Sequence, residues 1–203
     1  HICWLSLNQS DSDPQQLFHY LAAAIQPLPD VQAQLSQLLQ ANHSLPASTL
    51  MSAFIHDVTA VSTPFILLLD DYHLLESAEI DHALATLLDH MPLHMTLAIT
   101  SRSDPGFPLS RLRARGQLIE IRANELRFTV AETADFLYQT MGIQLTPEQI
   151  SALEQRTEGW IAGLQMAALS LQNRSGQDQS AFVQNFTGSH RFIIDYLVEE
   201  ALR

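Results

Sequence analysis

A run of five apolar residues, Phe65 to Leu69, is the feature that most limits how this chain can fold. Pro64 precedes the run, and two carboxylates, Asp70 and Asp71, follow it directly. A short apolar run without polar alternation is typical of a strand buried on both faces, as in a parallel sheet. The run therefore predicts an interior strand of an α/β fold with both of its faces covered.

Further strands and helices are predicted in alternation on both sides of this run. The other predicted strands, all rich in apolar residues, are 1–7, 93–100 and 118–122. Asp13-Pro14 predicts the start of a helix, with Asp13 as the N-cap and Pro14 at the first helical position, and the apolar residues that follow have helical spacing. Ser48 is the predicted cap of a later helix. Because strands alternate with helices, residues 1–122 are predicted to form an α/β core with a parallel sheet.

The pattern changes after residue 122, where helices alone are predicted. Thr129 and Thr146 each begin a capping box, with Glu132 and Gln149 three residues later. An all-helical subdomain is therefore predicted over 123–172. Residues 173–203 are predicted to begin a further helical segment.

Positive charge is confined to the second half of the chain. All ten basic residues are arginines at or after Arg102, and the net charge is −12. Nucleic-acid binding depends on Lys and Arg at phosphates, so this acidic balance argues against DNA binding by this segment. The four arginines from Arg102 to Arg115 either pair with the acidic first half or face an anion such as phosphate, and charge alone favours pairing.

The composition also excludes other classes of protein. A single cysteine, Cys3, excludes an intramolecular disulfide framework. No apolar run approaches the roughly 20 residues that span a bilayer, and the first residues lack the basic part of a signal peptide. We therefore expect a cytoplasmic protein without a membrane partner.

The two carboxylates after the apolar run are the strongest candidate functional residues. Ligands of open α/β sheets bind at the carboxyl ends of the strands, where Asp70 would hold Mg²⁺ and Asp71 would orient an attacking water. Arg102 follows the next strand, and if the two strands are neighbours it would stabilise charge on a γ-phosphate. The alternatives are an ordinary polar strand end, and an Arg102 paired with Asp71 or Asp104.

Together, these strand ends resemble the second half of a nucleoside triphosphatase core. The first half of such a core carries a phosphate-binding loop of the form Gly-x-x-x-x-Gly-Lys-Ser/Thr. This sequence contains no lysine and therefore lacks that loop. Because the chain starts abruptly at a strand, we expect it to be a partial core that has lost its beginning.

Six short segments occur in series along the chain. They are Trp4-Leu5-Ser6-Leu7, Leu69-Asp70-Asp71-Tyr72-His73, Thr100-Ser101-Arg102-Ser103-Asp104-Pro105, Leu109-Ser110-Arg111-Leu112-Arg113-Ala114-Arg115-Gly116, Glu125-Leu126-Arg127-Phe128-Thr129 and Thr157-Glu158-Gly159-Trp160-Ile161-Ala162-Gly163-Leu164-Gln165. Together they resemble the ATPase region of large LuxR-family bacterial transcription activators of the MalT kind, which belong to the STAND class of signal-transduction ATPases.

The resemblance implies a function and a set of site residues. It implies ATP or ADP with Mg²⁺ as cofactors. Asp70 would be the Mg²⁺ acid at the end of a Walker B strand, Asp71 would position the attacking water, and Arg102 would contact the γ-phosphate as both a nucleotide-binding and a catalytic residue. It also implies a helical lid over 123–172 and the start of a winged-helix-like segment over 173–203.

For the full-length protein, the resemblance implies a nucleotide-dependent switch that controls self-association and activation of transcription. DNA would be bound through a domain that this sequence does not contain. Turnover would be slow and regulatory, and this piece alone is expected to be inactive because it lacks the phosphate loop.

Two other functions stay open. The chain would be an interaction or scaffold module if the pair Asp70-Asp71 were vestigial. A metal-dependent phosphohydrolase using both acids ranks lower, because it needs further carboxylates at strand ends and only Asp104 is near one.

Overall fold

The structure is a computed structural model, and it describes residues 1–41, 45–172, 174 and 176–186. The chain divides into two compact units, residues 1–118 and 119–203. The predicted division into three parts, with boundaries after residues 122 and 172, stays a prediction. No helix among the described residues is both long and apolar enough to cross a bilayer.

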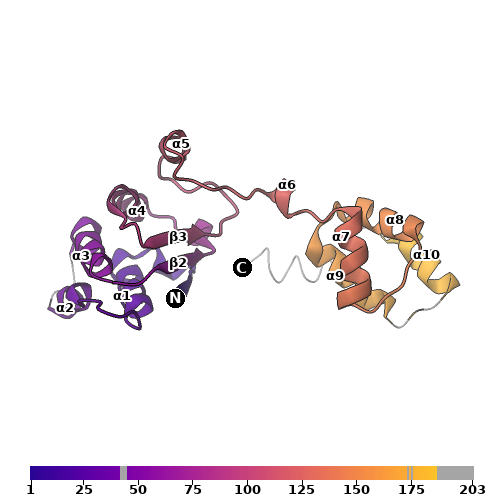
Figure 1. The fold of residues 1–203 in the computed structure, drawn as a ribbon, viewed down its shortest axis with the longest axis horizontal. Helices are drawn as coiled ribbons and strands as arrows, with labels where there is room; N and C mark the ends of the chain where they lie inside the picture. The colour runs from indigo at the N-terminus through magenta and orange to yellow at the C-terminus, as the bar shows by residue number, and fades with distance from the viewer. Residues whose placement is uncertain (42–44, 173, 175, 187–203) are drawn as a thin grey trace. The chain divides into compact units, whose positions relative to one another are not determined.

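The first unit is built on a three-stranded parallel sheet with the order β1-β2-β3 (Figure 1). The strands are β1 (Ile2–Ser6), β2 (Phe65–Asp70) and β3 (Met95–Ile99). The predicted parallel sheet is thus confirmed. The predicted strand over 118–122 is wrong: this segment belongs to no strand and pairs with none of the described ones, and Ile119 is 91% exposed.

Helices α1 (Pro14–Ile25), α2 (Gln34–Ala41) and α3 (Ala47–Thr59) connect β1 to β2, and α4 (Ala78–His90) connects β2 to β3. The short 3₁₀ turns η1 (Gln9–Ser12) and η2 (Tyr72–Leu74) lie in the same connections, and α5 (Leu109–Ala114) follows β3. Asp13 caps α1 by accepting a hydrogen bond from the backbone N–H of Gln15, with Pro14 at the first helical position. This confirms the start that the sequence predicts for α1.

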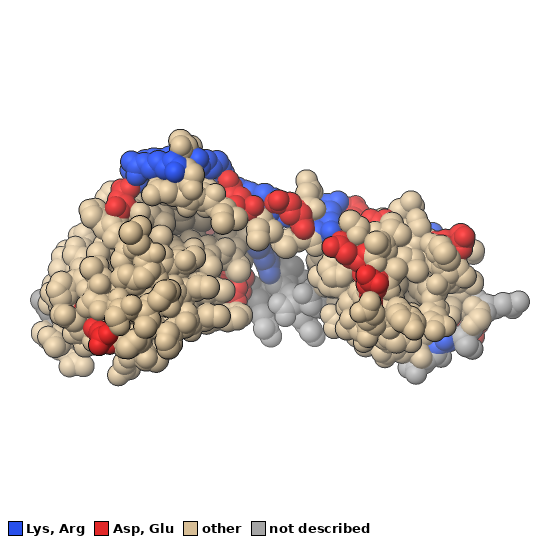
Figure 2. All heavy atoms as spheres, in the orientation of Figure 1, with Lys and Arg blue, Asp and Glu red and all other residues tan. Residues whose placement is uncertain are grey.

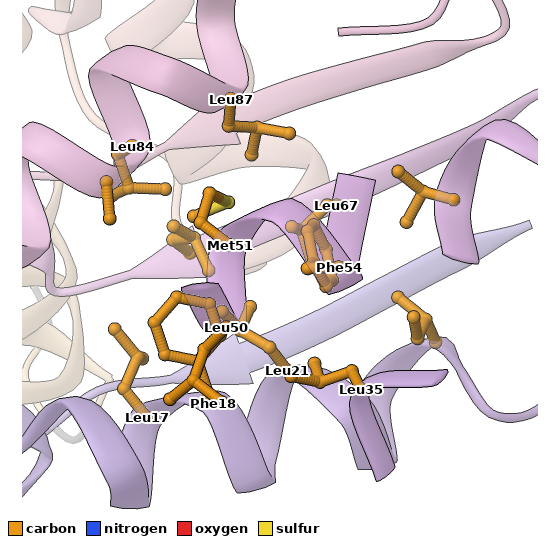
Figure 3. Close-up of a cluster of buried hydrophobic side chains, with 14 of the residues drawn as sticks. Leu17, Phe18, Leu21, Leu35, Leu50, Met51, Phe54, Leu67, Leu84 and Leu87 are labelled. Carbon is orange, nitrogen blue, oxygen red and sulfur yellow. The ribbon is translucent and has the colours of Figure 1, made fainter. Parts of the chain in front are cut away.

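The core of the first unit packs helices α1 to α4 against one face of the sheet. Helix α3 lies at its centre, because its Leu50 and Phe54 are fully buried. Figure 3 shows Leu67 of β2 beside Phe54, with Leu21 of α1 close by. This apolar cluster is the largest in the described part of the chain.

The prediction that both faces of β2 are covered is wrong. Leu67 and Leu69 are buried on the face that meets the helices, whereas Ile66 on the opposite face is 38% exposed. The reason is topological. Both crossovers, β1 to β2 and β2 to β3, run in the same direction across the sheet, and right-handed crossovers in one direction place their helices on one face.

Two carboxylates of the first unit cap helices by accepting hydrogen bonds from backbone N–H groups. Asp57, which is 1% exposed, accepts hydrogen bonds from the N–H groups of Gln34 and Leu35 at 2.8 and 2.9 Å, and so caps α2 from α3. Glu79 of α4 accepts the N–H of Ala47 at 2.9 Å. Helix α3 therefore begins at Ala47 with a cap from α4, and the predicted Ser48 cap is wrong.

Replacing Asp57 with alanine is expected to destabilise the first unit by about 1–3 kcal/mol, because it leaves the N–H donors of Gln34 and Leu35 without their acceptor. Asp57→Asn keeps one carbonyl oxygen and is expected to lose less. Native-state hydrogen exchange of the α2 amides measures the change. Equal exchange rates in Asp57→Ala and the unmodified protein would show that this cap contributes nothing.

The second unit contains helices and no strand among its described residues. The helices are α6 (Ala123–Leu126), α7 (Val130–Asp135), the π-helical turn η3 (Phe136–Thr140), α8 (Pro147–Thr157), α9 (Ile161–Leu171) and α10 (Gln177–Asn185). Thr129 and Thr146 form the capping boxes that the sequence predicts. The predicted winged-helix-like segment over 173–203 lies largely outside the described residues, which include only α10 and its immediate neighbours.

A tight turn joins α8 to α9 in the second unit. Glu158 and Gly159 both have positive φ, of 51° and 68°. The carbonyl of Gly159 accepts a hydrogen bond from the N–H of Phe128 at 2.8 Å, and a Cβ at position 159 would lie 2.4 Å from the oxygen of Phe128. Glycine is therefore required here by both backbone conformation and space.

Candidate functional site

The carboxyl end of the sheet carries a row of polar side chains. Ser6 of β1 is opposite Asp70 of β2, and Thr100 follows β3 with its N–H donating to the carbonyl of Leu69 at 3.0 Å. The hydroxyl of Ser6 donates to Oδ2 of Asp70 at 3.5 Å, and the hydroxyl of Thr100 donates to Oδ1. The carboxylate of Asp70 is thus held between two hydroxyl groups from the neighbouring strands.

The backbone turns sharply at the next residue. Asp71 has a φ of 58°, in the left-handed region that aspartate adopts more readily than most residues. Its N–H donates to Oγ1 of Thr100 at 3.0 Å, and the N–H of Tyr72 donates to the carbonyl of Thr100 at 2.9 Å. The side chain of Asp71 is half-exposed, and its Oδ1 lies 3.9 Å from Nδ1 of His73. The turn therefore fixes two adjacent carboxylates at one edge.

A buried tyrosine anchors the segments behind this edge. The hydroxyl of Tyr72 donates to Oδ1 of Asp81 on α4 at 2.6 Å. Burial, reinforced by this hydrogen bond, raises the pKa of Tyr72 far above its usual value, so the hydroxyl stays protonated as a donor. The ring of Phe107 meets Tyr72 edge-on, and a Cβ on Gly106 would overlap the Asp81 carboxylate. The loop after β3 is therefore fastened to α4.

Arg102 lies in that loop, two residues after Thr100. The loop that contains Arg102 therefore begins at the edge of the sheet that holds Asp70 and Asp71. Its side chain is exposed. Its contact with a γ-phosphate stays a prediction.

The other arginines of the predicted cluster gather on α5 (Figure 2). Arg111 pairs with Asp89 of α4 at 2.8 Å, and Arg115 lies 3.6 Å from the same carboxylate. The prediction that these arginines pair with the acidic first half of the chain is confirmed for these two residues. These ion pairs link the end of α5 to α4 at the surface.

The oxygen donors at this edge suit Mg²⁺. Magnesium prefers hard oxygen ligands, and typically takes one or two protein carboxylates together with phosphate oxygens and water. Asp70, with the hydroxyls of Ser6 and Thr100 beside it, supplies that donor set. No three side chains of His, Cys, Asp or Glu gather as a metal site in the part of the chain that the structure describes. A Mg²⁺ held by Asp70 would take its other ligands from water or from a bound phosphate.

Sequence reasoning missed several of the residues that shape this edge. Thr100 is the most important, because it contacts both Asp70 and Asp71. The sequence does indicate Thr100 as a candidate, since it is a polar residue directly after an apolar strand. Only the register of the sheet shows that it contacts the acid pair. The Tyr72–Asp81 hydrogen bond left no sequence signal.

Comparison with known proteins covers nearly the whole chain. No family model matches the sequence. Curated relatives named HTH-type transcriptional regulator MalT are 34% identical in Cronobacter sakazakii, and 32% identical in both Yersinia enterocolitica and Serratia proteamaculans. Each match covers 98% of this chain and 22% of the relative, so the chain spans about a fifth of their length. The chain is therefore MalT-like over nearly its whole length, as the sequence resemblance predicts.

Proposed function

We propose that this chain is the nucleotide-dependent switch segment of a transcriptional regulator, and that the edge holding Asp70 binds ATP or ADP with Mg²⁺. The observation that carries the proposal is the Asp70 carboxylate, held between the hydroxyls of Ser6 and Thr100 with Asp71 beside it. Ligand sites of open α/β sheets form at this edge. The similarity to HTH-type transcriptional regulators supports the regulatory context.

Each site residue has a distinct proposed role. Asp70 holds Mg²⁺, which when bound neutralises charge on the phosphates. Asp71 orients and accepts a proton from the attacking water, and Arg102 contacts the γ-phosphate. Since the chain has no lysine, arginine is the strong cation that it offers to a phosphate.

The proposed switch acts in the full-length protein. ATP and ADP must bind two states of the protein with different affinities, because a ligand that binds both equally shifts neither population. We propose that the ATP-bound state self-associates, that residues 123–172 act as a lid, and that DNA is bound by a domain outside residues 1–203. The acidic charge of this chain supports that assignment of DNA binding. A cytoplasmic location follows from the same proposal.

Asp70→Asn in the full-length protein tests the site directly. We expect the unmodified protein to bind ATP more tightly with Mg²⁺ than without it. Asp70→Asn is expected to weaken binding in Mg²⁺ by about tenfold, which corresponds to about 1.4 kcal/mol. Titration calorimetry with and without Mg²⁺ measures the difference.

Glu76→Gln is the matched control, because Glu76 is an exposed acid in the same unit that takes no part in the polar row. It is expected to bind as the unmodified protein does. If Asp70→Asn keeps the full Mg²⁺ dependence of ATP binding, Asp70 is not the magnesium ligand.

A further inference from the structure

Both ends of the loop after β3, residues 100–107, meet the same residue, Tyr72. At the start of this β3 loop, the N–H of Tyr72 donates to the carbonyl of Thr100 at 2.9 Å. At its end, the ring of Phe107 meets the ring of Tyr72 edge-on, with 6.1 Å between the ring centroids. The middle of the β3 loop is exposed, belongs to no helix or strand, and contains Arg102. The place of Arg102 therefore depends on how Tyr72 holds the two ends.

Tyr72 is itself held by a carboxylate on α4. Its side chain is 3% exposed, and its hydroxyl donates to Oδ1 of Asp81 at 2.6 Å. The other carboxylate oxygen, Oδ2, lies against Gly106, where an added Cβ would overlap it. A side chain at position 106 would therefore have to push the carboxylate aside. Asp81 thus contacts the tyrosine and the end of the β3 loop at once.

Tyr72 also follows directly after Asp71, the proposed base. The N–H of Asp71 donates to Oγ1 of Thr100 at 3.0 Å, one residue before the N–H of Tyr72 bonds the carbonyl of the same threonine. Any shift of Tyr72 therefore moves the β3 loop relative to Asp71. A misplacement of about 1 Å in a site can cost a reaction about 100-fold in rate.

We infer that Tyr72 is a positioning residue, which holds Arg102 where it contacts the γ-phosphate of a nucleotide bound beside Asp71. The inference rests on the nucleotide site proposed above. Tyr72 acts through Arg102, because its own hydroxyl is engaged with Asp81. Burial raises the pKa of Tyr72 far above its usual value, so the hydroxyl remains a fixed donor across the pH range of an ordinary assay.

Tyr72→Phe in the full-length protein tests the inference. It keeps the aromatic ring and the backbone hydrogen bond to Thr100, and removes only the hydroxyl that binds Asp81. Displacing Arg102 should weaken the binding of ATP and spare ADP, which has no γ-phosphate. We expect Tyr72→Phe to bind a non-hydrolysable ATP analogue with Mg²⁺ about tenfold more weakly, and to bind ADP as the unmodified protein does. Titration calorimetry measures both affinities.

Tyr20→Phe is the matched control, because Tyr20 is an exposed tyrosine on α1 whose hydroxyl accepts a hydrogen bond from Gln16 of the same helix. It is expected to bind both nucleotides as the unmodified protein does. Asp81→Asn keeps an oxygen acceptor for Tyr72, so it is expected to bind the ATP analogue more tightly than Asp81→Ala does.

A double variant shows whether Tyr72 acts through Arg102. Arg102→Ala is expected to weaken binding of the ATP analogue, and adding Tyr72→Phe to it should cause no further loss. A further loss in the double variant would overturn the inference. Equal weakening of ATP-analogue and ADP binding by Tyr72→Phe would also overturn it, because a general loss of structure affects both nucleotides.

Hydrogen exchange without nucleotide separates this inference from the proposed site. The amides of positions 72 and 109 donate to the carbonyls of Thr100 and Phe107, and both are expected to exchange faster in Tyr72→Phe than in Tyr20→Phe. Equal exchange would overturn the inference even in a protein that binds ATP. Failure of the proposed site is a different result, namely binding of the ATP analogue that Arg102→Ala and Asp70→Asn both leave unchanged.

Discussion

Replacing Asp71 with asparagine in the full-length regulator is expected to lower ATP turnover by about 10²–10⁴-fold, the usual contribution of a general base. Asparagine has nearly the same shape as aspartate and tolerates the left-handed conformation at position 71, so the turn and its hydrogen bond to Thr100 are expected to persist. The amide cannot accept the proton of the attacking water. ATP should therefore bind normally and remain unhydrolysed.

Single-turnover hydrolysis and retention of labelled ATP measure these two effects together. The ATP-bound state should persist in Asp71→Asn, and transcription should stay active longer after free ATP is removed. Glu76→Gln, which removes an exposed carboxylate, serves again as the control and is expected to hydrolyse ATP as the unmodified protein does. Unchanged turnover and unchanged activation in Asp71→Asn would instead support an interaction module with a vestigial acid pair.

Replacing Phe54 with alanine is expected to destabilise the first unit by about 3–5 kcal/mol, the usual cost of truncating a buried phenylalanine. Phe54 is completely buried in α3 and packs beside Leu67 of the central strand, so its loss leaves a cavity between helix and sheet (Figure 3). Because β2 carries Asp70 and Asp71, the loss of packing also loosens the candidate site.

Native-state hydrogen exchange of the α3 and β2 amides measures this loss in the intact protein, because it reports on each segment separately and needs no single unfolding transition. Leu93→Ala is the control, because the Leu93 side chain is fully exposed and its truncation leaves no cavity. Exchange from α3 that is as slow in Phe54→Ala as in Leu93→Ala would contradict the packing described for this core.

Local signals in the sequence predicted the local structure correctly. The five apolar residues before Asp70 form β2, and Asp13-Pro14 begins α1. The capping boxes at Thr129 and Thr146 form as predicted. Each of these features depends on residues within a few positions of one another, so a single sequence contains the information that determines it.

Predictions that depended on distant partners failed. The segment 118–122 has the composition of a strand, but it pairs with no described strand, and a strand requires a neighbour. Ser48 is a suitable cap by type, yet Glu79, 32 residues from Ala47, supplies the cap instead. The apolar run of β2 indicated two buried faces, because its sequence does not show on which side the crossovers lie.

The candidate site was predicted in part. The acid pair and the strand end were visible because charge directly follows a buried strand. The contribution of Thr100 was not, because it depends on the register between β2 and β3 rather than on any spacing along the chain. The geometry of the polar row is therefore information that only the folded sheet provides.

Hydrogen exchange of the full-length protein with and without ATP and Mg²⁺ tests most directly whether nucleotide binds at the carboxyl edge of this sheet. Nucleotide bound at this edge is expected to slow exchange at the amides of residues 70–73 and 100–103 when both ligands are present, and to leave exchange in α2 unchanged. Protection that appears elsewhere, while these two segments exchange as before, would contradict it.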